Sequence, residues 1–364
     1  MKKVKLKLLI PLIILGIFLA GCGTNEEGAT LAKEENQYNQ TTQTKDEDTV
    51  ELNNTRYYFT ANEGGSISKI DAATNKVVET IEVDGIVHNV QVSPDGKTVG
   101  ATVVPAMMHH DGDHGSMKMT GKAVFFDTNT NELLKSVEVG NHPAHIVFTE
   151  NGEYALVTNN EDNNVSVIDT ESFTVAQTVN TGKGPHGFRI STDSGKAYIA
   201  NMGEDTVSVL DLQTMEEEKR ITVGSAPVTT GVTSDGKILV ATINAENMLA
   251  IVDLATGQVK KVPVGNGPAQ GYIDANNQFA YVANQGTKDS PSNSVSVVDL
   301  AAKKVAATIE TGKGSHGVVT SSDGKRAYVT NMYENTVSVI DTEENKVIET
   351  IEVGETPNGI TIMK

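Results

Sequence analysis

Histidine and methionine, the residues that offer imidazole and thioether ligands, are concentrated in one short stretch. Residues 105–121 hold three of the eight histidines and four of the ten methionines. Thioether sulfur suits Cu(I), whereas imidazole suits Cu(II), Zn and Ni. The stretch therefore predicts a transition-metal site, with copper preferred and Zn or Ni as alternatives. Its candidate ligands are Met107, Met108, His109, His110, His114, Met117 and Met119.

A second group of histidines follows a recurring pattern, Gly-x-x-Pro-His-Gly. Alignment on this pattern gives His88, His145, His186 and His316, with His145 one position later than the others. The corresponding segments of three other units carry Thr229, Gln270 and Asn358 nearby. Side chains at one shared position of a repeat converge if the repeats close into a ring. These four histidines are therefore predicted to complete the metal site.

An aspartate at the end of a short alternating strand marks the repeat that must position these residues. It recurs at Asp71, Asp127, Asp169, Asp211, Asp253, Asp299 and Asp341, and four of the six gaps are 42 residues long. One unit, 314–354, reads as four strands separated by turn residues. Four strands in such a period predict an all-β fold, a seven-bladed β-propeller over residues 55–364, with 105–121 as an insertion.

The ends of the repeat region predict how the ring closes. The chain ends with a single first strand at 358–362, and the repeats begin with a second strand at 56–60. The last blade is therefore expected to combine one C-terminal strand with three N-terminal strands, which removes an exposed edge. In this arrangement all eight histidines lie on the same face as the starts of the inner strands.

Several short motifs resemble the YVTN family of bacterial and archaeal β-propellers. They are Ala-Tyr-Val-Thr-Asn (327–331), Tyr-Val-Ala-Asn (281–284), Tyr-Ile-Ala-Asn (198–201), Ser-Val-Ile-Asp (338–341) and Val-Ser-Pro-Asp-Gly (92–96). The similarity covers the chain from about residue 55 to its end. It implies the propeller fold and leaves the function open, because the family includes surface proteins, binding proteins and domains of redox enzymes.

The N-terminus has the features of a bacterial lipoprotein signal peptide. Four lysines precede an apolar run at 8–19, and Leu-Ala-Gly at 19–21 leads into Cys22, the only cysteine. We predict that residues 1–21 are removed as a signal peptide by cleavage before Cys22. Lipid, including palmitate, is then expected to be attached to Cys22. Polar residues 22–54 would then form a disordered tether. We therefore expect an extracytoplasmic protein anchored to the bacterial cell membrane.

The single cysteine and the charge exclude several classes of function. One cysteine allows neither an intramolecular disulfide nor a c-type haem attachment. The net charge of −18 argues against nucleic acid as a partner. No catalytic motif stands out, so enzymatic activity is left undecided and no catalytic residue is assigned.

The sequence leaves three functions open. The first is metal handling or sensing, most consistent with copper. The second is a surface scaffold that binds a protein or glycan partner without metal. The third is a metal-dependent redox or hydrolytic enzyme.

Overall fold

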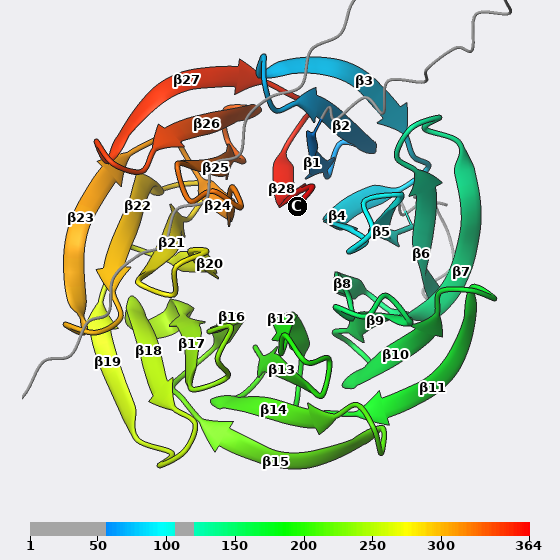
Figure 1. The fold of residues 1–364 in the computed structure, drawn as a ribbon, viewed down its shortest axis with the longest axis horizontal. Helices are drawn as coiled ribbons and strands as arrows, with labels where there is room; N and C mark the ends of the chain where they lie inside the picture. The colour runs from blue at the N-terminus through cyan, green and yellow to red at the C-terminus, as the bar shows by residue number, and fades with distance from the viewer. Residues whose placement is uncertain (1–55, 106–119) are drawn as a thin grey trace, which may run out of the picture. The chain divides into compact units, whose positions relative to one another are not determined.

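The fold is a β-propeller in the computed structural model, which describes residues 56–105 and 120–364. Seven four-stranded antiparallel sheets formed by these residues surround a common axis, as Figure 1 shows. The predicted fold class is thus confirmed. A single 3-10 turn, η1 (Asn244–Glu246), is the one helical element of the described chain. No helix within those ranges is long and apolar enough to cross a membrane.

Each blade runs from an inner strand at the axis to an outer strand at the periphery. The inner strands are β4 (Ile86–Val92), β8 (Pro143–Phe148), β12 (Pro185–Ile190), β16 (Pro227–Val232), β20 (Pro268–Ile273), β24 (Ser315–Thr320) and β28 (Pro357–Ile362). The second strands are β5 (Thr98–Val104), β9 (Tyr154–Asn159), β13 (Lys196–Asn201), β17 (Ile238–Ile243), β21 (Phe279–Gly286), β25 (Arg326–Asn331) and β1 (Tyr57–Asn62). The third strands are β6 (Thr120–Asp127), β10 (Asn164–Asp169), β14 (Thr206–Asp211), β18 (Met248–Asp253), β22 (Pro291–Asp299), β26 (Thr336–Asp341) and β2 (Ser66–Asp71). The outer strands are β7 (Leu133–Asn141), β11 (Thr174–Asn180), β15 (Glu216–Thr222), β19 (Val259–Pro263), β23 (Lys304–Glu310), β27 (Lys346–Glu352) and β3 (Lys76–Glu82).

One blade joins the two ends of the propeller, as the sequence predicts. The C-terminal strand β28 pairs antiparallel with β1, and the sheet order is β28-β1-β2-β3. Figure 1 shows this red strand beside the blue ones. The pairing covers the inner edge of β1, which would otherwise be left without a hydrogen-bonded neighbour at the point of closure.

The hydrophobic core lies between neighbouring blades. One cluster, for example, joins Phe59 and Ile67 of the closing blade to Val90, Val99 and Phe126 of the next. Because one face of each sheet packs on the preceding blade and the other on the following blade, both faces of the second and third strands are buried. Alternating short apolar residues can therefore build the core without tryptophan.

A β-bulge interrupts every inner strand near its start. The register against the second strand shifts between Pro185 and Phe188 in β12, and at the matching place in the other six inner strands. A bulge re-aims the side chains of the extra residues. The histidines of the Gly-x-x-Pro-His-Gly pattern lie in these bulges. A Cβ on Gly187, which follows His186, would come within 2.2 Å of Thr229 on the next inner strand.

Threonines of the second strands hold the bulges in place. In β9, the Thr158 hydroxyl accepts a hydrogen bond from the His145 amide at 3.0 Å and donates to the His186 carbonyl at 2.8 Å. The same two bonds are made by Thr102, Thr242 and Thr330 in their own blades. Each threonine thus links a bulge of its own blade to that of the next.

Replacing Thr158 with valine is expected to lower the free energy of unfolding by about 1–3 kcal/mol. Valine keeps the shape but leaves the His145 amide and the His186 carbonyl without their buried partner. Chemical denaturation would measure the change. Thr158→Ser, which keeps the hydroxyl, serves as the control and should recover most of the loss. A loss in Thr158→Ser with none in Thr158→Val would show that the methyl packing, not the hydrogen bonds, matters.

Candidate metal centre

Three of the four predicted pattern histidines come together at the axis. His88, His145 and His186 belong to the consecutive inner strands β4, β8 and β12, and one ligand nitrogen from each lies within 4.8 Å of the other two. The ring centroids of His145 and His186 are 5.0 Å apart, and those of His88 and His186 are 5.5 Å apart. We call these three residues the histidine cluster.

The Nδ1 atoms of His88 and His186 both lie within hydrogen-bonding distance of an oxygen acceptor. His88 Nδ1 lies 3.1 Å from Glu63 Oε1, and His186 Nδ1 lies 3.2 Å from the Val228 carbonyl. Carboxylate and carbonyl oxygens only accept hydrogen bonds, so we assign the proton to Nδ1 in both rings. Each Nε2 then presents a lone pair toward the cluster.

The two Nε2 atoms face each other at a distance that a shared cation would explain. They are 3.4 Å apart. Two lone pairs at this separation repel unless a proton or a metal ion lies between them. Two nitrogens bound at about 2.05 Å to one tetrahedral ion are roughly 3.3 Å apart. The spacing of His88 and His186 therefore fits two ligands of the same metal.

His145 is the third member of the cluster and the most unusual one. It is 1% exposed, and neither of its ring nitrogens has a hydrogen-bond partner among residues 56–105 and 120–364. A buried polar group without a partner costs free energy, so such groups are rare in folded proteins. Because nitrogens on one tetrahedral ion are roughly 3.3 Å apart and those of the cluster lie within 4.8 Å of one another, the ring of His145 would move by up to about 1.5 Å to bind.

Burial keeps His145 and His186 neutral, which is the protonation state that binds metals. Burial, followed by repulsion from His186 and His88, holds the pKa of His145 well below its usual value. Burial and the nearby His88 lower the pKa of His186 to about 3. Imidazoles with such pKa values carry free lone pairs at neutral pH.

Glu63 and Asn358 support His88 from behind. Burial alone would raise the pKa of the Glu63 carboxyl, but hydrogen bonds from His88 and Asn358 lower it overall. The Asn358 amide donates to Glu63 Oε1 at 2.7 Å. A carboxylate behind an imidazole orients the ring and makes it a stronger ligand. Glu63 is not among the residues predicted from the sequence, although its place directly after the buried Asn62 at the end of β1 puts it on this face.

The remaining predicted ligands are placed differently. His316 lies in β24, 6% exposed, with Nδ1 3.4 Å from the Asn358 carbonyl, and it is not a member of the histidine cluster. His142, which is not among the predicted ligands, lies in the segment before β8 and is exposed, with Nδ1 3.7 Å from Glu161 Oε1. Cys22, with 1–21 and the tether, falls outside the described residues. The same holds for Met107, Met108, His109, His110, His114, Met117 and Met119.

The insertion joins the fold on the same face as the histidine cluster. Val104, near its start, pairs with Ile86 at the beginning of β4, two residues before His88. At its other end, a Cβ on Gly121 would come within 2.1 Å of Pro143, the first residue of β8. Both attachment points thus lie beside the strands that carry His88 and His145.

Replacing Glu63 with glutamine is expected to weaken metal binding by the histidine cluster about tenfold. Glutamine still accepts from His88 Nδ1 but removes the negative charge that strengthens the imidazole, and loss of such a partner costs 10–100-fold in affinity. Competition titration against a chromogenic chelator would measure the change. Glu161→Gln, a carboxylate facing the exposed His142, is the matched control and should leave the affinity unchanged. An unaltered affinity in Glu63→Gln would exclude this role of Glu63.

Comparison with known proteins identifies the family of the fold. The model of the family described as "YNCE-like beta-propeller" matches residues 114–278 and 282–364. No curated protein sequence matches the chain. Among solved structures, hydrazine synthase from Kuenenia stuttgartiensis is similar at a TM-score of 0.65 and 19% identity, over 76% of this chain and 89% of that one. A functionally unknown protein from Desulfotomaculum acetoxidans DSM 771 is similar at a TM-score of 0.69 and 14% identity, over 85% of this chain and 99% of that one. At such identities the structures share the fold alone. The matched residues make this chain a member of the YNCE-like β-propeller family.

Proposed function

We propose that the propeller binds a transition-metal ion at the histidine cluster and serves in metal handling or sensing. The observation that carries this proposal is the facing pair of Nε2 atoms of His88 and His186, 3.4 Å apart, with the unpartnered His145 beside them. Hydrogen bonds donated by both Nδ1 atoms direct the two Nε2 lone pairs toward one point. A cation at that point satisfies all three imidazoles.

Copper is the metal we propose. Imidazole is a suitable ligand for Cu(II), Zn and Ni, so the three imidazoles alone do not select among these metals. The methionines of the 105–121 insertion add soft ligands that favour Cu(I), and the ends of the insertion lie beside the cluster strands. A site that combines imidazole and thioether could hold copper in both oxidation states.

Metal titration of the full chain tests the proposal. Cu(I), Cu(II), Zn and Ni would each be titrated into the wild type, into a variant lacking 106–119, and into a variant with His88, His145 and His186 changed to alanine. Tight copper binding that is lost in the histidine variant supports the proposal. A loss confined to the deletion variant would place the metal on the insertion alone. No binding tighter than ~10 µM, roughly 7 kcal/mol, would overturn it and favour a protein- or glycan-binding scaffold.

We further propose that lipid on Cys22 anchors the propeller outside the cytoplasm, at the bacterial cell membrane. The support is the lysine-rich start, the apolar run and the Leu-Ala-Gly-Cys sequence at 19–22. Metabolic labelling with a palmitate analogue should mark the wild type and leave Cys22→Ser unmarked. Labelling of the serine variant would contradict lipid attachment at this residue.

A further inference from the structure

The axis has a second polar site at the end opposite the histidine cluster. A cavity of about 340 Å³ lies there, lined by the last residues of inner strands and the turns that follow them. Arg189 enters it from β12, three residues after His186, which corresponds to about 10 Å of extended chain. The register places Arg189 opposite Tyr198, and the matching residues of the other six inner strands carry no charge: Gln91, Val147, Gly231, Tyr272, Val319 and Thr361.

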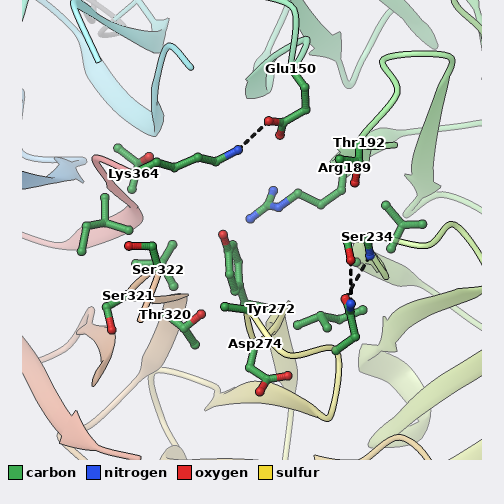
Figure 2. Close-up of a pocket in the computed structure, with 18 of the residues that line it drawn as sticks. Glu150, Arg189, Thr192, Ser234, Tyr272, Asp274, Thr320, Ser321, Ser322 and Lys364 are labelled. Atoms are coloured by element: carbon green, nitrogen blue, oxygen red, sulfur yellow. Dashed lines mark hydrogen bonds and ion pairs between the residues drawn. The ribbon is translucent and has the colours of Figure 1, made fainter. Parts of the chain in front are cut away.

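Arg189 has most of its hydrogen-bonding capacity unused. Its Nη1 donates to the Phe188 carbonyl at 2.8 Å, and its guanidinium lies 5.5 Å from the centre of the Tyr272 ring. No carboxylate pairs with it anywhere in the described part of the chain. A guanidinium has five N–H donors arranged to bind planar oxyanions in a bidentate manner. Figure 2 shows the guanidinium and the Tyr272 hydroxyl pointing into the same open space.

The other charged groups of the cavity already have hydrogen-bond partners. Lys364 Nζ donates to Glu150 Oε2 at 2.5 Å across the cavity. The Asp274 carboxylate accepts hydrogen bonds from the Gln278 and Phe279 amides at 2.7 and 2.8 Å. Arg189 is therefore the cation of the cavity without a direct carboxylate partner, and the two carboxylates nearby would repel a second negative charge on a ligand.

The rest of the lining is apolar or uncharged. Val232, Ile273 and Ile362 contribute hydrocarbon surface, and Tyr272 contributes an aromatic face. A cavity of this size accommodates a small organic molecule. We propose that it binds a small organic monocarboxylate, whose carboxylate pairs with Arg189 and whose apolar part packs against Tyr272. This proposal is independent of the metal site, because the two sites use different residues at opposite ends of the axis.

Calorimetric titration of the full chain with benzoate, benzamide and inorganic phosphate, in the presence of a chelator, tests the proposal. Benzoate is expected to bind, and neutral benzamide to bind about tenfold more weakly or worse, since hydrogen bonds to a charged group are worth 1.5–3 kcal/mol. Phosphate, which carries more charge and no apolar part, should bind more weakly than benzoate. Absence of benzoate binding, equal binding of benzamide, or tighter binding of phosphate would each overturn the assignment.

Variants locate the site. Arg189→Gln should reduce benzoate affinity by about tenfold or more. Arg326→Gln is the matched control, because Arg326 is paired with Asp341 at 2.7 Å and is not among the cavity residues. It should bind benzoate as the wild type does. Unchanged affinity in a folded Arg189→Gln, or an equal loss in Arg326→Gln, would contradict the site. If Arg189→Gln does not fold, the comparison of benzoate with benzamide in the wild type still decides.

Discussion

Replacing His145 with leucine should abolish tight metal binding and, at the same time, stabilise the metal-free propeller. Leucine is close to histidine in size and removes two buried nitrogens that have no partner among the described residues. An unsatisfied buried polar group costs about 1–3 kcal/mol, so the metal-free variant should gain on the order of 1 kcal/mol or more. Metal affinity should fall on the order of 100-fold or more, since losing even an outer partner of a ligand costs 10–100-fold.

Gln270→Leu is the matched control for His145→Leu. Gln270 lies at the corresponding bulge position of β20, is 2% exposed, and its Nε2 also lacks a partner within the described ranges. This variant should gain stability in the same way but bind metal as the wild type does. Denaturation with and without metal, together with competition titration, separates the two effects. If His145→Leu instead loses stability without metal, His145 is a structural residue and the metal proposal loses its third ligand.

A histidine that destabilises the fold unless a ligand is present indicates selection for binding. A structural histidine would have its nitrogens bonded to backbone groups, as His186 Nδ1 is to the Val228 carbonyl. Filling the position with an aliphatic side chain would be the simplest way to stabilise the axis. The opposite signs expected for stability and affinity therefore distinguish a ligand from a packing residue.

The fold could be predicted from the sequence because the same turn-forming residues recur at the same position of each repeat. Asp341, which marks the repeat, accepts hydrogen bonds from the Glu343 and Glu344 amides, both at 3.0 Å, and so begins the turn after the third strand. An aspartate that bonds its own backbone is favoured in such turns wherever they recur. The closing blade followed from counting strands at the two ends, and β28 pairs with β1 as expected.

The composition of the site was only partly predictable, because bulges break the period of two. The pattern correctly placed His88, His145 and His186 at matching starts of inner strands. The pattern did not show that His145, one position later in its strand, still reaches His186. It does so because both positions lie within the bulge. The pattern also did not show that Asn358 separates His316 from His88.

Groups that act across blades were not found from the sequence at all. Glu63 and His88 belong to neighbouring blades, and their contact depends on how the ring closes. Arg189 and Tyr272 meet across the axis from β12 and β20, 83 positions apart in the numbering of the chain. Such contacts follow from ring geometry, and a single repeat unit carries no signal for them.

The metal-free propeller should lose stability steeply between pH 6.5 and 4, and His316 should account for a measurable part of the loss. Burial and the nearby His88 lower the pKa of His316 to about 4, against an ordinary value of 6.5, although Glu63 opposes the shift. In this range the unfolded chain binds a proton that the folded chain does not. Stability present above pH 6.5 is therefore lost as the pH falls toward 4, by on the order of 3 kcal/mol for this residue.

Comparison with His316→Asn isolates this contribution. Asparagine is the residue at the matching position of the next inner strand, Asn358, and it does not titrate. The variant leaves a smaller side chain and will differ from the wild type in stability at pH 7. The informative quantity is the change in unfolding free energy between pH 7 and 4.5 with a chelator present, which should be smaller in the variant by about 2–3 kcal/mol. Equal changes in both proteins would mean that His316 takes up its proton in the folded state at an ordinary pH, and hence that water reaches it from the axis.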